Sequence, residues 1–256
     1  MNQLLAFINK EFMELSRSGK LFILIIISVF FGIMNPAIAK LTPWMMHLFT
    51  DSLKDSGIII TEIKVDALTS WAQFFKNAPL VIIIFVIMFS AVLTMEYQKG
   101  TLINILTKGL ARSKIIIAKS SIMVFIWTIC FSLYFGITYI YNSFFWDNSI
   151  ASYLLLAVFC IYLFGIWLIA LIIFTSTLTN NNTSVLLSTG AIVILCYLIG
   201  IVPTLTKYMP TQLLSAGSLL ASTITLNSIL PAMYLTILIT IIIFIISIPI
   251  FNKKQL

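Results

Sequence analysis

Six long apolar runs constrain this chain more than any other feature of its sequence. Each approaches or exceeds the length of about 20 apolar residues that an α-helix needs to cross a bilayer core of about 30 Å. Inside a bilayer the backbone must satisfy its own hydrogen bonds, which a helix does within one segment. The sequence therefore predicts an all-α integral membrane protein with six transmembrane helices. The runs are 21–39, 79–95, 115–141, 150–178, 183–202 and 231–251.

The composition agrees with this fold class. Of the 256 residues, 61% are hydrophobic and only 9% are charged, and the mean hydropathy is +1.11. These shares lie far from those of an average soluble domain. A net charge of +7 would suggest nucleic acid for a soluble protein, but in a membrane protein basic residues gather in cytoplasmic loops. We expect one transmembrane domain over residues 1–256 and no nucleic-acid partner.

The positions of Lys and Arg predict the orientation, because these residues accumulate on the cytoplasmic side. With a cytoplasmic N-terminus, the inside segments carry Lys10, Arg17, Lys20, Lys99, Lys108, Arg112, Lys114, Lys119, Lys253 and Lys254. The outside segments carry Lys40, Lys54, Lys64, Lys76 and Lys207. We therefore predict six spans with both termini in the cytoplasm.

Residues 1–20 precede the first span and have a helical apolar pattern. The apolar positions are Leu4, Ile8, Phe12 and Leu15. This spacing predicts an amphipathic helix along the inner membrane interface, with a solvated leader that continues into the first span as the alternative. Residues 37–39 resemble a signal-peptide cleavage site, but Glu11 and Glu14 in the preceding segment argue against a cleaved signal.

Three further segments connect the spans. Residues 40–78 form the longest hydrophilic stretch and predict an ordered extracellular loop, in which Trp44 and Trp71 mark the headgroup level. Residues 179–182 fit a tight turn between the fourth and fifth spans. Residues 203–230 contain Pro203 and Pro210 among leucines, so we expect an outside segment with short helices that re-enter the bilayer.

The sequence lacks several kinds of chemistry. It has no phosphate-binding P-loop motif, and it has one histidine, His47, so neither ATP binding nor a histidine-rich metal site is expected in this chain. Between residues 120 and 252 the only charged residues are Asp147 and Lys207, both in predicted loops. Proton-coupled carriers place titratable groups near the bilayer midplane, so proton coupling is disfavoured. Sodium coupling through Ser and Thr hydroxyls stays open beside their ordinary role in helix packing.

Charge is concentrated in the strip EYQKGTLINILTKGLARSKIIIAK, residues 96–119. Gly100 and Gly109 bound a short predicted helix over 102–108, with Thr101 as its N-cap. Its apolar face would hold Leu102, Ile105 and Leu106. Two interpretations follow, and the residues alone favour neither. The helix rests on anionic headgroups through its basic flanks, or it inserts into a groove on a soluble partner.

This strip resembles the intracellular loop of ABC-2 type permeases, the membrane subunits of type V ABC transporters. The family shows an acidic residue after span two, then Lys/Arg-Gly-Thr, a short apolar helix, a small residue with Arg, and a Lys that opens span three. The counterparts here are Glu96, Lys99-Gly100-Thr101, 102–106, Ala111-Arg112 and Lys119. The resemblance extends over the chain, including the Phe74-Phe75-Lys76-Asn77 approach to span two. The long first outside loop departs from many members.

The resemblance implies a non-enzymatic permease subunit in a bacterial cytoplasmic membrane. It would pair with a second permease, identical or homologous, and with two copies of an ABC ATP-binding subunit that bind ATP and Mg. Residues 96–114 would form the cytoplasmic coupling loop, and a Glu96–Arg112 pair would set the angle of the coupling helix to span two. The residues implied at the ATPase interface are Glu96, Gly100, Thr101, Leu102, Ile105, Leu106 and Arg112.

Spans rich in Ile, Leu, Val and Phe suit a hydrophobic or amphipathic cargo, such as a peptide, toxin, drug or lipid, better than a sugar or ion. Within the family, the size and outer loop are similar to exporters of amphipathic toxic peptides, including phenol-soluble modulins. Drug efflux and sodium extrusion fit the same features. The alternatives from other classes are a nonenzymatic membrane scaffold or regulatory subunit and a sodium-linked secondary carrier.

Overall fold

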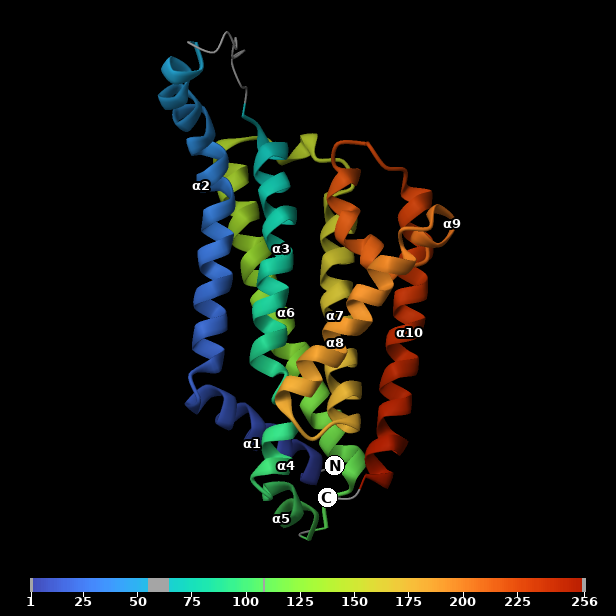
Figure 1. The fold of residues 1–256 in the computed structure, drawn as a ribbon. Helices are drawn as coiled ribbons and strands as arrows, with labels where there is room; N and C mark the ends of the chain where they lie inside the picture. The colour runs from blue at the N-terminus through green and yellow to red at the C-terminus, as the bar shows by residue number, and fades with distance from the viewer. Residues whose placement is uncertain (1, 55–64, 108, 255–256) are drawn as a thin grey trace.

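The computed structural model describes residues 2–54, 65–107 and 109–254, without the side chains of residues 2, 46–54, 104 and 105. All regular structure within these ranges is helical (Figure 1). In chain order the elements are α1 (Asn2–Arg17), α2 (Lys20–Lys54), α3 (Ala67–Phe89), α4 (Thr94–Gln98), α5 (Thr101–Thr107), α6 (Arg112–Phe145), η1 (Asn148–Ile150), α7 (Leu154–Leu178), α8 (Asn182–Ile199), α9 (Pro203–Thr206), η2 (Pro210–Leu219) and α10 (Leu226–Lys253).

Among the described residues, six helical segments are long and apolar enough to cross a membrane, which confirms the prediction of a multi-pass membrane protein. They are Lys20–Met45, Ala67–Gln98, Arg112–Phe145, Leu154–Leu178, Asn182–Ile199 and Leu226–Lys253. The chain ends marked N and C in Figure 1 lie at the same end of the bundle, beside α1, α4 and α5. An even number of crossings requires this arrangement.

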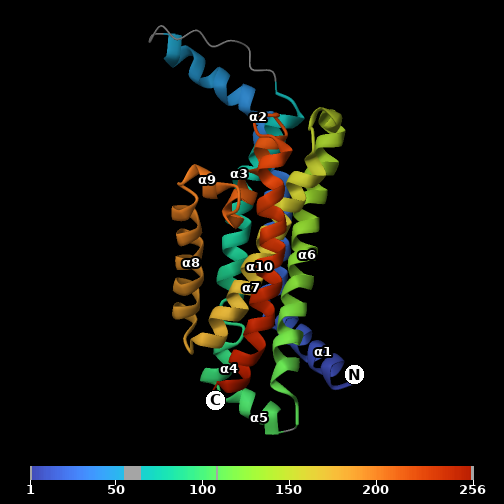
Figure 2. The ribbon, with the colours of Figure 1, turned by 90° about the vertical axis from the view of Figure 1, so that its right-hand side faces the viewer.

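Helix α7 forms the centre of the bundle and α8 lies at its edge. Of the most apolar window of each helix, 78% is buried in α7 and 11% in α8, and α8 stands at one side in Figure 2. A side chain at Gly165 of α7 would place its Cβ 2.3 Å from the Trp127 ring of α6, so only glycine permits this approach. Thr175 and Thr189 join α7 to α8 through hydroxyls 3.0 Å apart.

A buried polar network joins α2, α3 and α6. The Asn77 amide donates to Asn35 Oδ1 at 2.9 Å, and the Asn35 amide donates to Thr138 Oγ1 at 3.2 Å. Next to it, the ring of Tyr134 stacks on Phe74 with centroids 4.3 Å apart, and its hydroxyl donates to the Phe74 carbonyl at 2.7 Å. Because an unpaired amide is costly in an apolar interior, these bonds fix the rotation of the three helices.

The predicted 40–78 loop is largely helical, so this prediction is wrong over most of its length. Helix α2 continues through Pro36 and Pro43 to Lys54, and α3 begins at Ala67. Asp66 caps α3, because its carboxylate accepts from the backbone N–H of Thr69 at 3.0 Å. Polar composition indicated a loop here, but a helix that leaves the bilayer can carry polar residues on every face. Residues 55–64 lie outside the described residues.

The segment before the last span is folded into the bundle. In Figure 1, η2 rises beside the upper half of α7 and α10, and the chain then turns into α10. The buried side chains of η2 include Leu213, Ala216 and Leu219. A Cβ at Gly217 would lie 2.7 Å from Phe75 Cγ of α3, which shows how closely η2 approaches that helix. The 203–230 segment is therefore packed structure that contains the short helices α9 and η2.

Candidate functional site

Three elements meet at the end of the bundle that holds the chain termini. Helix α1 lies across this end, α6 begins there, and α4 follows a break after α3 (Figure 1). The break spans residues 90–93, where a turn separates Phe89 from Thr94. Phe7 and Glu11 of α1 are buried, with 7% and 5% of their surfaces exposed. The N-terminal segment is helical, as its apolar spacing predicted, and the buried Glu11 points into the protein.

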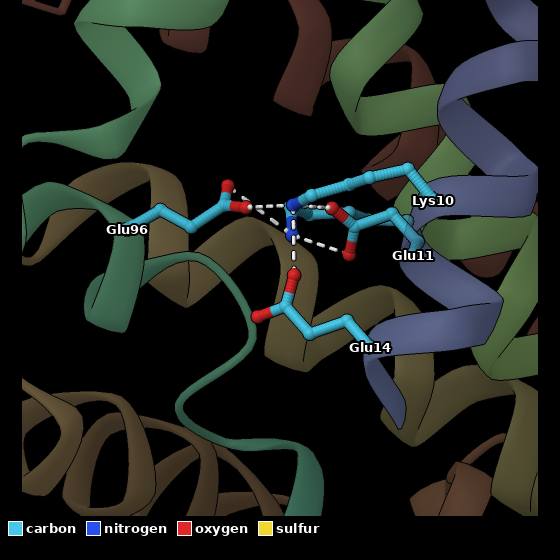
Figure 3. Close-up of polar contacts among 5 residues, drawn as sticks. Lys10, Glu11, Glu14 and Glu96 are labelled. Atoms are coloured by element: carbon cyan, nitrogen blue, oxygen red, sulfur yellow. Dashed lines mark hydrogen bonds and ion pairs between the residues drawn. The ribbon is translucent and has the colours of Figure 1, made fainter. Parts of the chain in front are cut away.

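Two lysines and three glutamates form an ionic cluster at this junction (Figure 3). Lys119 of α6, only 2% exposed, lies with its Nζ 2.8 Å from Glu11 Oε2 and 3.2 Å from Glu96 Oε2. Lys10 Nζ lies 2.9 Å from Glu11 Oε1, 2.8 Å from Glu14 Oε2 and 3.3 Å from Glu96 Oε1. Each ammonium thus bridges carboxylates of α1 and α4, and Lys119 also anchors both to α6.

The electrostatics keep Lys10 and Glu11 of α1 ionised. Burial alone would raise the pKa of Glu11, but the charge and hydrogen bond of Lys119, together with Lys10, outweigh burial and lower that pKa. Partial burial opposes the charged form of Lys10, yet hydrogen bonds to Glu14 and Glu11 and the charge of Glu96 raise its pKa above the ordinary value. Lys10 and Glu11 therefore form an ion pair at neutral pH.

The three carboxylates of the cluster lie close enough together to face a single cation. Glu11, Glu14 and Glu96 offer oxygens within 4.8 Å of one another. Lys10 and Lys119 already supply the positive charge between them, at the distances given above. The cluster therefore joins helices and does not form a metal centre. A cavity of about 90 Å³ beside it separates α1 from the α3–α4 break and is lined also by Lys20 and Met88.

Helix α5 lies where the sequence predicted a short helix. Gly100 and Gly109 flank it with φ of +65° and +83°, a backbone region that favours glycine. Leu102 is 1% exposed and Leu106 is partly buried, so both pack into this chain, while Ile103 is 48% exposed. The predicted apolar face of Leu102 and Leu106 thus holds α5 on the bundle, and among the described apolar side chains of α5 the exposed one is Ile103. The side chain of Ile105 lies outside the described residues.

A groove of about 230 Å³ separates α4 and α5 from the turn between α7 and α8. Tyr97, Leu102 and Ile103 line one wall, and Asn180 and Asn181 line the other. The Gln98 amide reaches across, donating to Asn181 Oδ1 at 3.3 Å and to the Asn180 carbonyl at 3.5 Å. Gly100 also lines the groove, and Thr101 follows it as an exposed residue at the start of α5.

The predicted Glu96–Arg112 pair is wrong. Arg112 Nη1 donates instead to the carbonyls of Phe251 at 3.2 Å, Asn252 at 3.3 Å and Lys254. The last carbonyls of a helix have no helical partners and carry its negative dipole end, so a guanidinium is well placed there. Glu96 is paired with Lys119, and Lys10 donates to its Oε1 at 3.3 Å. Arg112 therefore fixes the end of α10, and Glu96 fixes α4.

The end of α10 is also tied to the turn after α7. Lys254 Nζ donates to the carbonyls of Thr179 at 2.7 Å and Ser176 at 3.4 Å, and it lies 4.1 Å from the Tyr97 ring centroid. Burial lowers the pKa of Lys254 to about 8. This end of the protein is thus cross-linked by polar contacts among α1, α4, α6, α7 and α10.

Sequence reasoning missed Lys10 and Glu11 as members of the site. Lys119 gave a usable signal, because it is the only charged residue within the predicted 115–141 run and a charge there needs a partner. The identity of that partner depends on how α1 folds back, which local periodicity does not reveal. No protein-family model matches the chain, and no curated protein matches it.

Proposed function

We propose that this chain is the permease subunit of an ATP-driven exporter of the ABC-2 type. The observation that carries the proposal is the rigid link from α5 to the membrane helices. Only Lys99 and Gly100 separate α5 from α4, and Glu96 of α4 is paired with the buried Lys119 of α6. A force on α5 would reach a membrane-spanning helix through an ion pair with little freedom, as coupling to a soluble motor requires.

The orientation proposed places the end with α1, α4, α5 and the C-terminus in the cytoplasm of a bacterial cell. Basic residues at this end include Lys10, Lys20, Lys99, Arg112 and Lys254, which agrees with the positive-inside rule. In this orientation α1 lies at the inner membrane interface, and η2 enters the bilayer from the outer side between α7 and α10.

Helix α5 is proposed as the coupling helix. Its exposed Ile103, together with Thr101 and the groove toward Asn180, gives an ATP-binding subunit an apolar contact with polar edges. Behind this surface lie four residues whose side chains make contacts within the chain and so position α5: Glu96, Leu102, Leu106 and Arg112. ATP and Mg would be bound by the partner, which would be present in two copies.

The cargo class proposed is hydrophobic or amphipathic, such as a peptide, toxin, drug or lipid. Exposed apolar side chains cover α8 and α10, including Leu187, Ile194, Tyr234 and Ile245. These faces are available to membrane lipid and to a second permease, identical or homologous. Thr175 and Thr189, whose hydroxyls bond to each other between α7 and α8, are engaged in helix packing, which favours an ATP-driven exporter over a sodium-linked carrier.

Co-purification tests the proposal. In mild detergent the chain should retain a P-loop ATPase whose hydrolysis is inhibited by vanadate. Changing Ile103 to Asp should remove this ATPase while the protein stays folded, since a charge would replace an exposed apolar contact. Leu5→Asp is the matched control, because Leu5 is 54% exposed on α1 at the same end. Retention of the ATPase by Ile103→Asp, or its equal loss from Leu5→Asp, would contradict the assignment of α5.

A further inference from the structure

A second cavity lies at the end of the bundle opposite the chain termini. It has a volume of about 550 Å³ and lies between α6, η1 and α7. Phe135, Tyr139 and Trp146 supply aromatic walls, Leu155 supplies an apolar surface, and Asp147 and Asn148 provide polar edges. The transport proposal above makes no use of this cavity.

The aromatic wall is fixed by packing and hydrogen bonds. The ring centroids of Phe135 and Tyr139 are 5.7 Å apart, and the fully buried Trp71 backs them at 5.7 and 6.4 Å. Trp71 Nε1 donates to Asn148 Oδ1 at 3.0 Å, which ties α3 to η1. The Asn148 amide in turn donates to Ser143 Oγ at 2.8 Å. The wall is therefore formed before any ligand arrives.

The charge of the cavity has one sign. Asp147 is exposed, and hydrogen bonds from the Ser149 hydroxyl at 2.6 Å and from its backbone N–H at 2.9 Å lower the pKa of Asp147. None of the described residues that line the cavity is basic. Lys40, a cation on α2, is engaged elsewhere, with its Nζ 3.7 Å from the Phe145 ring centroid. A carboxylate and the negative faces of aromatic rings favour a cation.

The apolar part of the cavity opens at the surface of the bundle. Leu155 is 72% exposed and Tyr139 is 41% exposed. A ligand with a charged head and an apolar chain could thus place the head near Asp147 and the chain along Leu155. We propose that this cavity binds the cationic headgroup of an amphiphile, with the ammonium over the Tyr139 and Trp146 rings and near the Asp147 carboxylate.

Direct binding tests this site without any ATPase. The probe is radiolabelled decyltrimethylammonium, used below its micelle-forming concentration with the full chain in nanodiscs of zwitterionic lipid. Equilibrium dialysis should show saturable binding above that of empty nanodiscs, and decyl sulfate should not compete. Added salt should weaken the binding, because an exposed carboxylate is screened.

Two variants separate the contribution of the Asp147 charge to binding from that of the aromatic rings. Asp147→Asn keeps a side-chain cap for η1 and should weaken binding about three- to fivefold, as removal of an exposed ion pair would. Trp146→Leu should weaken it about tenfold through loss of cation–π and apolar contact. Phe144→Leu is the matched control, since Phe144 is 81% exposed on α6 and does not line the cavity, and it should bind as the parent does.

Equal binding of decyl sulfate, or unchanged affinity in both Asp147→Asn and Trp146→Leu, would overturn the site. Equal loss of affinity in Phe144→Leu would also overturn it, because the effect would then reflect the membrane surface and not the cavity. Loss of the co-purifying ATPase has no bearing on these results, so the two proposals fail independently.

Discussion

Lys119 shows how one residue determines the chemistry of the junction. Its ammonium is almost completely buried and is held by two carboxylates from α1 and α4. Removing one partner of a buried ion pair leaves an uncompensated charge, which is more costly than the net stabilisation from the intact pair. The cluster therefore stabilises the junction only while it is complete.

We expect Lys119→Met to destabilise the protein by about 3–5 kcal/mol, because Glu11 and Glu96 would remain buried without Lys119. The triple variant Lys119→Met, Glu11→Gln, Glu96→Gln should regain most of this loss, since no unpaired charge remains. Lys99→Met is the control at an exposed position. Thermal unfolding in detergent measures the stability of all three variants. A Lys119→Met protein as stable as the parent would show that the cluster does not hold the junction.

Two buried asparagines differ in whether their side-chain amides are hydrogen-bonded. The Asn77 side chain donates to Asn35 in the bonded network, whereas neither side-chain polar atom of Asn142 has a hydrogen-bond partner among the described residues. An unpaired buried amide costs about 1–3 kcal/mol. Asn142→Leu should therefore raise the thermal midpoint, and Asn77→Leu should lower it. The opposite order of midpoints would be inconsistent with this account.

At the scale of elements, α1 is the helix whose docking depends on ionisation. Glu11 has a lowered pKa in the folded protein. Its contribution to stability is therefore present above the unfolded pKa of about 4.3 and is lost as the pH falls from there through the lower pKa of the folded protein. Lys10, with a raised pKa, stays charged throughout this range. Acidification should therefore release α1 from α4 and α6 before the bundle itself unfolds.

Hydrogen exchange of residues 2–17, corrected for the intrinsic effect of pH, measures this release. Protection should be high at pH 7 and should fall below about pH 4.3, while α7 stays protected. Glu11→Gln should show weak protection of α1 at both pH values, because its charge is absent throughout. Constant protection of α1 in the parent across this range would contradict the role given to Glu11.

The same scale shows what the sequence could and could not predict. The spans and the short helix between Gly100 and Gly109 follow from local composition, and they are present. The continuation of α2 to Lys54 was missed, because outside the bilayer a polar stretch is compatible with a loop and with a helix alike. The partners of Glu96 and Arg112 were also missed, because each depends on which helix ends meet in space.

At the scale of the molecule, the two ends of the bundle differ in character. One end is cross-linked by charged and polar contacts among α1, α4, α6, α7 and α10. The opposite end carries an aromatic cavity with a single carboxylate. This asymmetry fits a protein that receives force at one end and meets an amphipathic molecule at the other, with the central α7 joining the two.

The most direct test of ATP-driven export uses inside-out membrane vesicles that contain the chain and its co-purifying ATPase. The measurement is uptake of a labelled amphipathic peptide into the vesicles, with ATP present or exhausted and ion gradients maintained. The account predicts uptake that requires ATP, is blocked by vanadate, and is lost in Ile103→Asp but kept in Leu5→Asp. Uptake that continues at the same rate after ATP is exhausted would contradict it.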